Sequence, residues 1–362
     1  MSEFSNLGTR YRAILKALAI GIPAGFLFAW LDTPIPWMIG PMVVIAACNL
    51  MGAKLQSVPF GRQTGQVILG SAVSLYFTAT VLAALAAHFG AIVAATCSAF
   101  LIGGVGAFIL NRVSGVDGKS TFFASIPGGA MAMAVLAERY GASVPAVAVA
   151  HSLRVSFVVI AVPFAVTYSG IPLESFGPAR PEVPFNAGIL AVWLGASFLL
   201  GGLAERFKLQ NGYLLMPIFF GAALTVSGVQ LSAVPHWMTD FAQLMFGVIL
   251  GARYDRDFFI RYKLFVPFAL INAVVILVLS ALVGFGLAWM FGLPIATMLV
   301  ATAPGGLAEM TLAAQALGIG VPLIVAFHFF RVVMVNMGAQ HIFVVGTWAW
   351  RRLRPQPKAG AE

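Results

Sequence analysis

The sequence has few charged residues. Only 9% of its 362 residues are Asp, Glu, Lys or Arg, whereas 60% are hydrophobic and the mean hydropathy is +0.95. Soluble domains carry about 25% charged residues, so this chain cannot cover a water-facing surface. Apolar runs long enough to cross a bilayer, about 20 residues each, fill most of its length. The composition excludes an ordinary soluble protein and predicts an all-α, polytopic integral membrane protein.

Acidic residues are scarcer than basic ones, 12 against 21. The basic residues are scattered over short loops and the two ends, which is typical of membrane orientation rather than of a nucleic-acid-binding patch. The tails, 1–12 and 348–362, are too short to fold a soluble DNA-reading domain. No Walker motif is present, so ATP is excluded as the energy source. We therefore expect no nucleic-acid partner.

Residues that bind metals are also few. The two cysteines, Cys48 and Cys97, lie in apolar runs without a CxxC spacing. None of the five histidines has a second histidine three or four residues away, and no Glu-x-x-His run occurs, so the usual ligand spacings on a helix are absent. A cluster of His151 with His328 across the fold stays open, but it would lack the usual carboxylates. We expect no cofactor, no metal and no enzymatic activity.

What the chain does have is an internal repeat. The stretch "SIPGGAMAMAVLAERYGASVPAVAVAHSLRV" (125–155) corresponds to "TAPGGLAEMTLAAQALGIGVPLIVAFHFFRV" (302–332), with a constant offset of 304 − 127 = 177. Gln66 and Gly70 match Gln243 and Gly247 at the same offset. The repeat predicts two homologous halves, at 1–169 and 187–347. A Pro-rich linker (170–186) joins them, and a basic tail (348–362) follows.

Basic loops predict how the chain threads the membrane. The twelve apolar segments lie near 13–31, 37–53, 63–86, 89–110, 119–138 and 143–168, and near 186–204, 212–229, 239–252, 263–291, 294–316 and 320–347. Cytoplasmic loops collect Lys and Arg, and every basic loop falls inside if the fifth and eleventh segments enter and leave on one side. This favours inverted repeats of five transmembrane helices plus one re-entrant hairpin each. The alternative is twelve spans in parallel repeats. We expect a bacterial inner membrane, with both termini cytoplasmic.

The fifth and eleventh segments each contain a Pro-Gly-Gly break. Pro lacks an N–H and Gly lets the chain turn, and each freed backbone group costs several kcal/mol in lipid unless protein or water satisfies it. Matched breaks in two halves mark the binding site of a transporter. The helices that begin after them, at Gly129 and Gly306, direct N–H groups and a positive dipole end at the break, which suits an anion. The candidate substrate-binding residues are Ser125, Pro127, Gly128, Gly129, His151, Arg154, Thr302, Pro304, Gly305, Gly306, Glu309, His328 and Arg331.

The duplicated His and Arg have two interpretations. They stand three apart and share a helix face, and an Arg inside a membrane marks a functional site by default. Alternatively, each Arg caps the carbonyls of its own hairpin and never contacts solute. Glu309 interrupts the repeat, because Ala132 stands at the matching position. Its candidate roles are an ion pair with Arg154 or Arg331, or the transport of a coupling proton.

The stretch "PWMIGPM" (36–42), the two Pro-Gly-Gly segments and the duplicated His-x-x-Arg resemble the AbrB-duplication membrane family, also labelled an ammonia monooxygenase. The resemblance covers about 14–346. It implies members that have been called regulators, oxygenases or transporters. We predict a secondary transporter of a small anionic solute, coupled to H⁺ or Na⁺. The alternatives are a membrane sensor that acts on gene expression through a partner, and a membrane metal monooxygenase. The expected partners are lipid and the anion, and a homodimer is left open.

Overall fold

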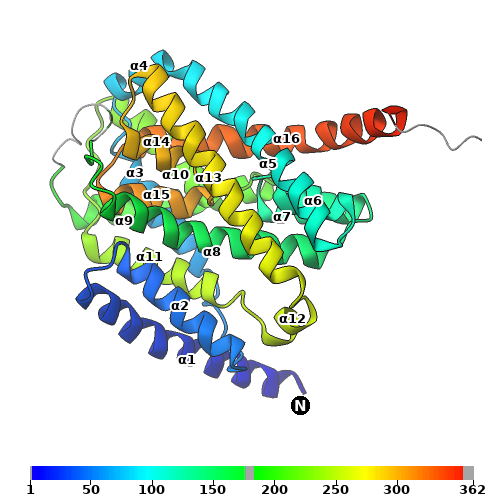
Figure 1. The fold of residues 1–362 in the computed structure, drawn as a ribbon. Helices are drawn as coiled ribbons and strands as arrows, with labels where there is room; N and C mark the ends of the chain where they lie inside the picture. Colours follow the sequence, from blue (N-terminus) through cyan, green and yellow to red (C-terminus); the bar gives the residue numbers. More distant parts are fainter. Residues whose placement is uncertain (1, 175, 177–182, 354–362) are drawn as a thin grey trace, which may run out of the picture.

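The fold is helical throughout the described part of the chain, residues 2–174, 176 and 183–353, in a computed structural model (Figure 1). In chain order the helices are α1 (Ser2–Trp30), α2 (Pro36–Leu50), α3 (Gly61–Ser74), α4 (Ala79–Ala87), α5 (Phe89–Ser114), α6 (Gly118–Ser125), α7 (Ala130–Arg139), α8 (Val144–Tyr168), α9 (Ala187–Arg206), α10 (Gly212–Val226), α11 (His236–Gly251), α12 (Arg256–Arg261), α13 (Phe265–Phe291), α14 (Ile295–Thr302), α15 (Leu307–Leu317) and α16 (Val321–Leu353). α16 extends into the predicted tail, whose residues 354–362 lie outside the described part, as do residues 175 and 177–182 of the predicted linker.

Within these residues, six helices are long and apolar enough to cross a membrane: α1, α5, α8, α9, α13 and α16. This confirms a polytopic membrane protein. The other predicted spans correspond to α2, α3, α10 and α11, which have 14 to 16 residues each. A straight helix needs about 20 residues to cross the hydrocarbon core, so each of these covers only part of that thickness.

The predicted segment 63–86 is not one helix. The structure divides it into α3 and α4, which are bent by 92° relative to one another. The Thr78 hydroxyl accepts the Val81 N–H at 3.3 Å and caps the start of α4. A side-chain cap of this kind starts a helix at a defined residue, and hydropathy alone does not detect it.

The helices pack as two groups. One contains α1–α3 and α9–α11, and the other contains α5–α8 and α13–α16. In the first group the repeated glycines allow close crossings. A Cβ added to Gly70 would lie 2.5 Å from the Leu214 carbonyl oxygen of α10, and one added to Gly247 would collide with the Met38 carbonyl of α2. The Gln-x-x-x-Gly spacing is therefore repeated in the two halves because each glycine lets the backbone of a neighbouring helix come close.

α5 and α13, which occupy equivalent positions in the two halves, run in opposite directions where they meet. A Cβ on Gly90, at the start of α5, would lie 3.7 Å from Phe291, at the end of α13. One on Gly106, further along α5, would lie 2.9 Å from Asn272, near the start of α13. In Figure 1 the α6–α7 segment accordingly lies toward the end of the molecule where α1 begins, and α14–α15 lies toward the other end.

Candidate functional site

The first Pro-Gly-Gly break is the tip of a helical hairpin, called hairpin 1 (α6 and α7). α6 ends at Ser125 and α7 begins at Ala130. The open ends of the hairpin are joined, because Lys119 Nζ donates to the Tyr140 carbonyl at 3.1 Å and the Ser143 N–H donates to Ser120 Oγ at 2.7 Å. The two helices therefore start and finish at the same place, and the Gly-Gly tip lies at the far end.

The second break has the same form and is called hairpin 2 (α14 and α15). α14 ends at Thr302 and α15 begins at Leu307, while Gly320, just beyond α15, packs tightly against Thr297 near the start of α14. Gly129 and Gly306 are the N-cap residues of α7 and α15. The predicted helix starts after both breaks are thus confirmed.

His151 and Arg154 hold hairpin 1 from α8. The Arg154 guanidinium donates to the carbonyls of Ala124 at 3.3 Å, Ser125 at 3.0 Å and Ile126 at 3.4 Å, and also to His151 Nδ1 at 3.0 Å. Because that ring nitrogen accepts, the other, Nε2, carries the proton and donates to the Phe123 carbonyl at 2.9 Å. The neutral imidazole thereby orients the arginine.

His328 and Arg331 hold hairpin 2 from α16 through similar backbone contacts, although here the arginine does not bond the imidazole and His328 Nδ1 has no hydrogen-bond partner among the described residues. His328 Nε2 bonds the Val300 carbonyl at 3.0 Å, which is the position equivalent to Phe123. The Arg331 guanidinium donates to the carbonyls of Ala303 and Gly305. These are the contacts of the second interpretation, in which each Arg caps its own hairpin.

The two arginines lie where short helices end. The last carbonyls of a helix have no partner within it and carry the negative end of its dipole, so a cation is stabilised there. Arg154 is 3% and Arg331 5% exposed, and within the described residues neither forms an ion pair with a carboxylate. The C-terminal end of a helix carries only about half a negative unit charge. It therefore does not neutralise the full positive charge of the guanidinium, and each hairpin retains a net positive charge beside its arginine.

The hydroxyls beside the breaks face α13. Asn272 Nδ2 of α13 donates to Ser125 Oγ at 2.9 Å and so joins two helices. The Thr302 hydroxyl lies 3.0 Å from the Ser280 carbonyl of α13 and 2.9 Å from the Met298 carbonyl. Both hydroxyls therefore fasten a hairpin to its neighbour. Asn49 does not join two helices: its amide bonds both backbone groups of Leu55 in the following loop.

Glu309 lies in the first turn of α15, so close to the hairpin 2 tip that a Cβ on Gly306 would collide with its carboxylate. A negative charge is stabilised at a helix N-terminus. No ion pair with Arg154 or Arg331 occurs among the described residues. The cation on which Glu309 acts is Arg253, in the loop after α11: desolvation by the surrounding protein lowers the pKa of Arg253, and the Glu309 charge raises it. The sequence analysis missed Arg253 because Tyr76 stands at the equivalent position.

The tip of hairpin 1 has polar neighbours that the sequence analysis also missed. The Gly129 N–H donates to Asn336 Oδ1 at 3.0 Å, and Asn336 Nδ2 donates to Gln210 Oε1 at 2.9 Å. Neither residue is repeated in the other half. Val159 stands at the position equivalent to Asn336, and Pro34 at the position equivalent to Gln210, where the offset between the halves is 176 because Pro41 matches Pro217. A search for matched residues passes over such positions. The only signal for Asn336 is an amide in a largely apolar helix, and Gln210 lies in the loop between α9 and α10.

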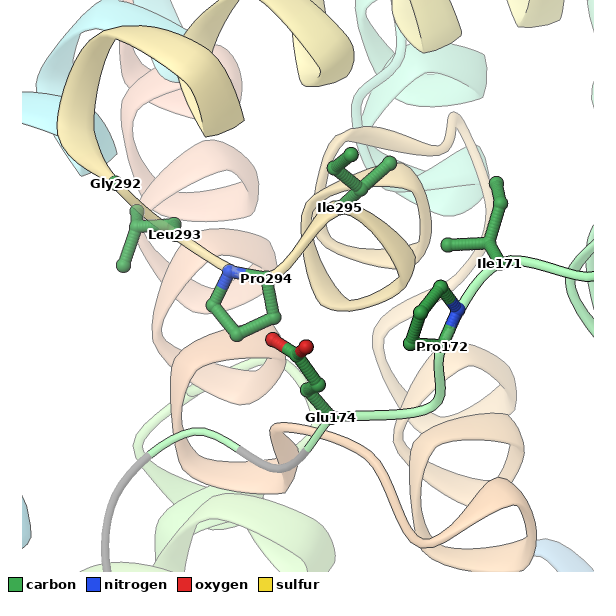
Figure 2. A pocket seen from close by; sticks show the side chains of 7 residues that line it. All are labelled: Ile171, Pro172, Glu174, Gly292, Leu293, Pro294 and Ile295. Atoms are coloured by element: carbon green, nitrogen blue, oxygen red, sulfur yellow. The ribbon is translucent and has the colours of Figure 1, made fainter.

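A surface pocket of about 280 Å³ lies away from both tips, at the open end of hairpin 2. It is lined by residues 171, 172 and 174 after α8 and by residues 292–295 before and at the start of α14. In Figure 2 the Glu174 carboxylate points toward Pro294. No predicted site residue lines this pocket. Across the described part of the chain, no three His, Cys, Asp or Glu side chains are grouped so that they could hold a metal ion.

Comparison with known proteins agrees with this architecture. The profile of the family described as "Transition state regulatory protein AbrB" matches residues 37–346. The chain belongs to the AbrB family. It is 27% identical to the Escherichia coli (strain K12) protein named "Putative regulator AbrB", over 94% of this chain and 97% of that protein. It is 24% identical to "Uncharacterized protein YhjN" of Bacillus subtilis (strain 168), over 88% and 89% of the two chains.

Proposed function

We propose that this AbrB-family protein is a secondary transporter of a small organic anion. The observation that carries the proposal is the pair of broken hairpins, each held at its tip by a buried His–Arg pair from a neighbouring long helix. Unwound backbone at membrane depth is tolerated where it lines a cavity or is buried in protein, and paired breaks at matched positions are the mark of transporter sites.

We further propose that the repeats are inverted and that the hairpins are re-entrant from opposite faces. Three observations support this arrangement. α5 and α13 run antiparallel, and the two helices of each hairpin start and finish at the same place. Every basic loop then falls on one side of the membrane. The side with these loops is the cytoplasm of a bacterial cell, where both termini would lie. If the two halves exchanged conformations, the hairpin tips would be exposed alternately to the two faces of the membrane.

The preference for an anion follows from charge. Arg154 and Arg331 are buried cations that donate only to neutral groups, and the tips add the N-terminal ends of α7 and α15. A negative solute near the tips relieves this excess, and electrostatic interactions count for more there than in water. The solute would contact the backbone of Gly128, Gly129, Gly305 and Gly306, next to Pro127 and Pro304. Glu309 supplies an acidic group for a coupling proton.

Transport is tested in vesicles. Purified protein is reconstituted, and charge movement on rapid exchange of acetate, succinate and methanesulfonate is recorded under an imposed pH gradient, then under a Na⁺ gradient. We expect a signal for at least one anion with one of the two gradients. A protein that gives no signal, and instead binds a cytoplasmic protein stoichiometrically, would be the sensor of the alternative hypothesis. A protein that retains copper or iron and oxidises a substrate would be the monooxygenase.

A further inference from the structure

The two hairpins share a backbone design but not their surroundings. The loops before α2 and α10 end alike: Ile35 caps α2 with φ 52°, and Asn211 caps α10 with φ 58°, 176 positions later. Both copies adopt the left-handed conformation at this position, which accounts for the turn of the chain before each helix. It does not explain why the second copy carries an amide where the first carries a buried isoleucine.

Around hairpin 1 the polar side chains form a connected network. From the Gly129 N–H it runs through Asn336 to Gln210, as described above. At the next residue along the chain, Asn211 Oδ1 accepts from Arg62 Nη2 at 3.0 Å and from Gln66 Nε2 at 3.2 Å. Two adjacent residues of the loop between α9 and α10 thus contact side chains of α3 and α16, and α16 in turn contacts the hairpin tip.

Around hairpin 2 the same positions are filled differently. Val159 stands where Asn336 stands, Thr239 where Arg62 stands, and Pro34 where Gln210 stands. Gly306, the counterpart of Gly129, is covered by the carboxylate of Glu309. The pseudo-symmetric fold therefore surrounds the two tips differently: amide side chains and Arg62 surround hairpin 1, whereas a carboxylate covers the tip of hairpin 2.

Arg62 is the charge of this site. Its guanidinium donates a hydrogen bond to a neutral amide oxygen, that of Asn211, and within the described residues it forms no ion pair with a carboxylate. Its side chain is exposed, whereas Gln66 beside it is only 2% exposed. A carboxylate that replaced the amide oxygen would form charge-assisted hydrogen bonds, which are about twice as strong as neutral ones. The guanidinium fork also matches a carboxylate in geometry.

We propose that the side chains that recognise the transported solute are those around hairpin 1, namely Arg62, Gln66, Gln210, Asn211 and Asn336, and that the solute is a small hydroxycarboxylate. Its carboxylate would take the place of Asn211 Oδ1 on Arg62 and Gln66. Its hydroxyl would lie between Gln210 and Asn336, whose amides offer both donors and acceptors. This inference names the substrate class of the transporter proposed above and rests on that function.

Binding to the purified, full-length protein tests the site without requiring transport. Calorimetric titrations compare three pairs that differ by one hydroxyl: glycolate with acetate, lactate with propionate, and malate with succinate. A site built to bond a hydroxyl discriminates strongly against an analogue that lacks it, so in the best pair we expect the hydroxy acid to bind at least about tenfold more tightly.

Variants assign the contacts. Arg62→Gln should weaken both members of that pair, and Asn336→Val, which installs the residue of the other half, should remove the hydroxyl preference. The matched control is Arg139→Gln. This arginine is also exposed, is on hairpin 1 and donates to the neutral Gln340 Oε1 at 3.3 Å, but lies at the open end of the hairpin. It should bind like the wild type. If Arg62→Gln does not fold, Arg62→Lys, which keeps the charge and loses the fork, should weaken binding in its place.

The proposal is overturned if no pair shows a hydroxyl preference, or if the Arg62 and Arg139 variants bind alike. Its failure is separable from failure of the transport proposal. Vesicles that show gradient-driven anion signals, unchanged in Arg62→Gln, would preserve transport and reject this site. Tight hydroxycarboxylate binding without any vesicle signal would preserve the site and reject transport.

Discussion

Replacement of each buried arginine by lysine separates a structural role from solute binding. Arg154 donates to three carbonyls and one imidazole nitrogen, whereas Arg331 donates to two carbonyls two residues apart. A lysine presents its donors from a single atom and lacks the planar fork. It can bridge neighbouring carbonyls, but it cannot reproduce the whole set. We therefore expect both variants to lose hairpin contacts, and Arg154→Lys to lose more.

The loss can be estimated from these contacts. A hydrogen bond to a charged group contributes about 1.5–3 kcal/mol. If Arg154→Lys loses two such bonds, the cost is about 3–6 kcal/mol, and if Arg331→Lys loses one, about 1.5–3 kcal/mol. One kcal/mol shifts the melting temperature of a domain of 150–250 residues by about 2–4 °C and that of a longer chain by less. We expect drops of several degrees in both variants, larger for Arg154→Lys.

The measurement is thermal unfolding of purified protein in detergent, followed by intrinsic tryptophan fluorescence, with anion binding measured on the same samples. Arg112→Lys serves as the control, because this exposed arginine near the end of α5 stacks on Phe108 at 5.0 Å and forms none of the hairpin hydrogen bonds described above. If either hairpin variant unfolds at the wild-type temperature yet fails to bind the anion, that arginine is a solute ligand and the bracing argument is wrong for it.

Two further predictions concern packing and topology. Gly70→Ala places a methyl group against the Leu214 carbonyl oxygen and should destabilise the protein by about 1–3 kcal/mol. Gly104→Ala, with nothing within 4 Å, should be neutral or slightly stabilising, and equal melting temperatures would refute the close crossing. In a background without the native cysteines, Val113→Cys and Met290→Cys, 177 apart and both exposed, should react with a membrane-impermeant maleimide from opposite sides of oriented vesicles. Reaction from the same side would restore the parallel repeats.

Much of this architecture follows from local chemistry, which the sequence displays directly. Pro127 and Pro304 remove a backbone donor, and the glycines behind them restart the helix, so both breaks and both N-caps could be predicted within a few residues. The repeat itself can be read from the sequence, because matched residues stand at a fixed offset. The AbrB resemblance rests on the same residues, and the family match confirms it.

Other features depend on neighbours that lie far apart along the chain. Whether a buried guanidinium turns to its own hairpin or to a solute is decided by which carbonyls are free nearby, and only the packed structure places the last carbonyls of α6 in front of Arg154. The contact of Asn336 with Gln210 joins residues 126 positions apart. The chemical difference between the hairpins was likewise invisible to a search for matched residues, because a repeat reveals what two halves share. What distinguishes them is decided by side chains that meet only when the fold closes.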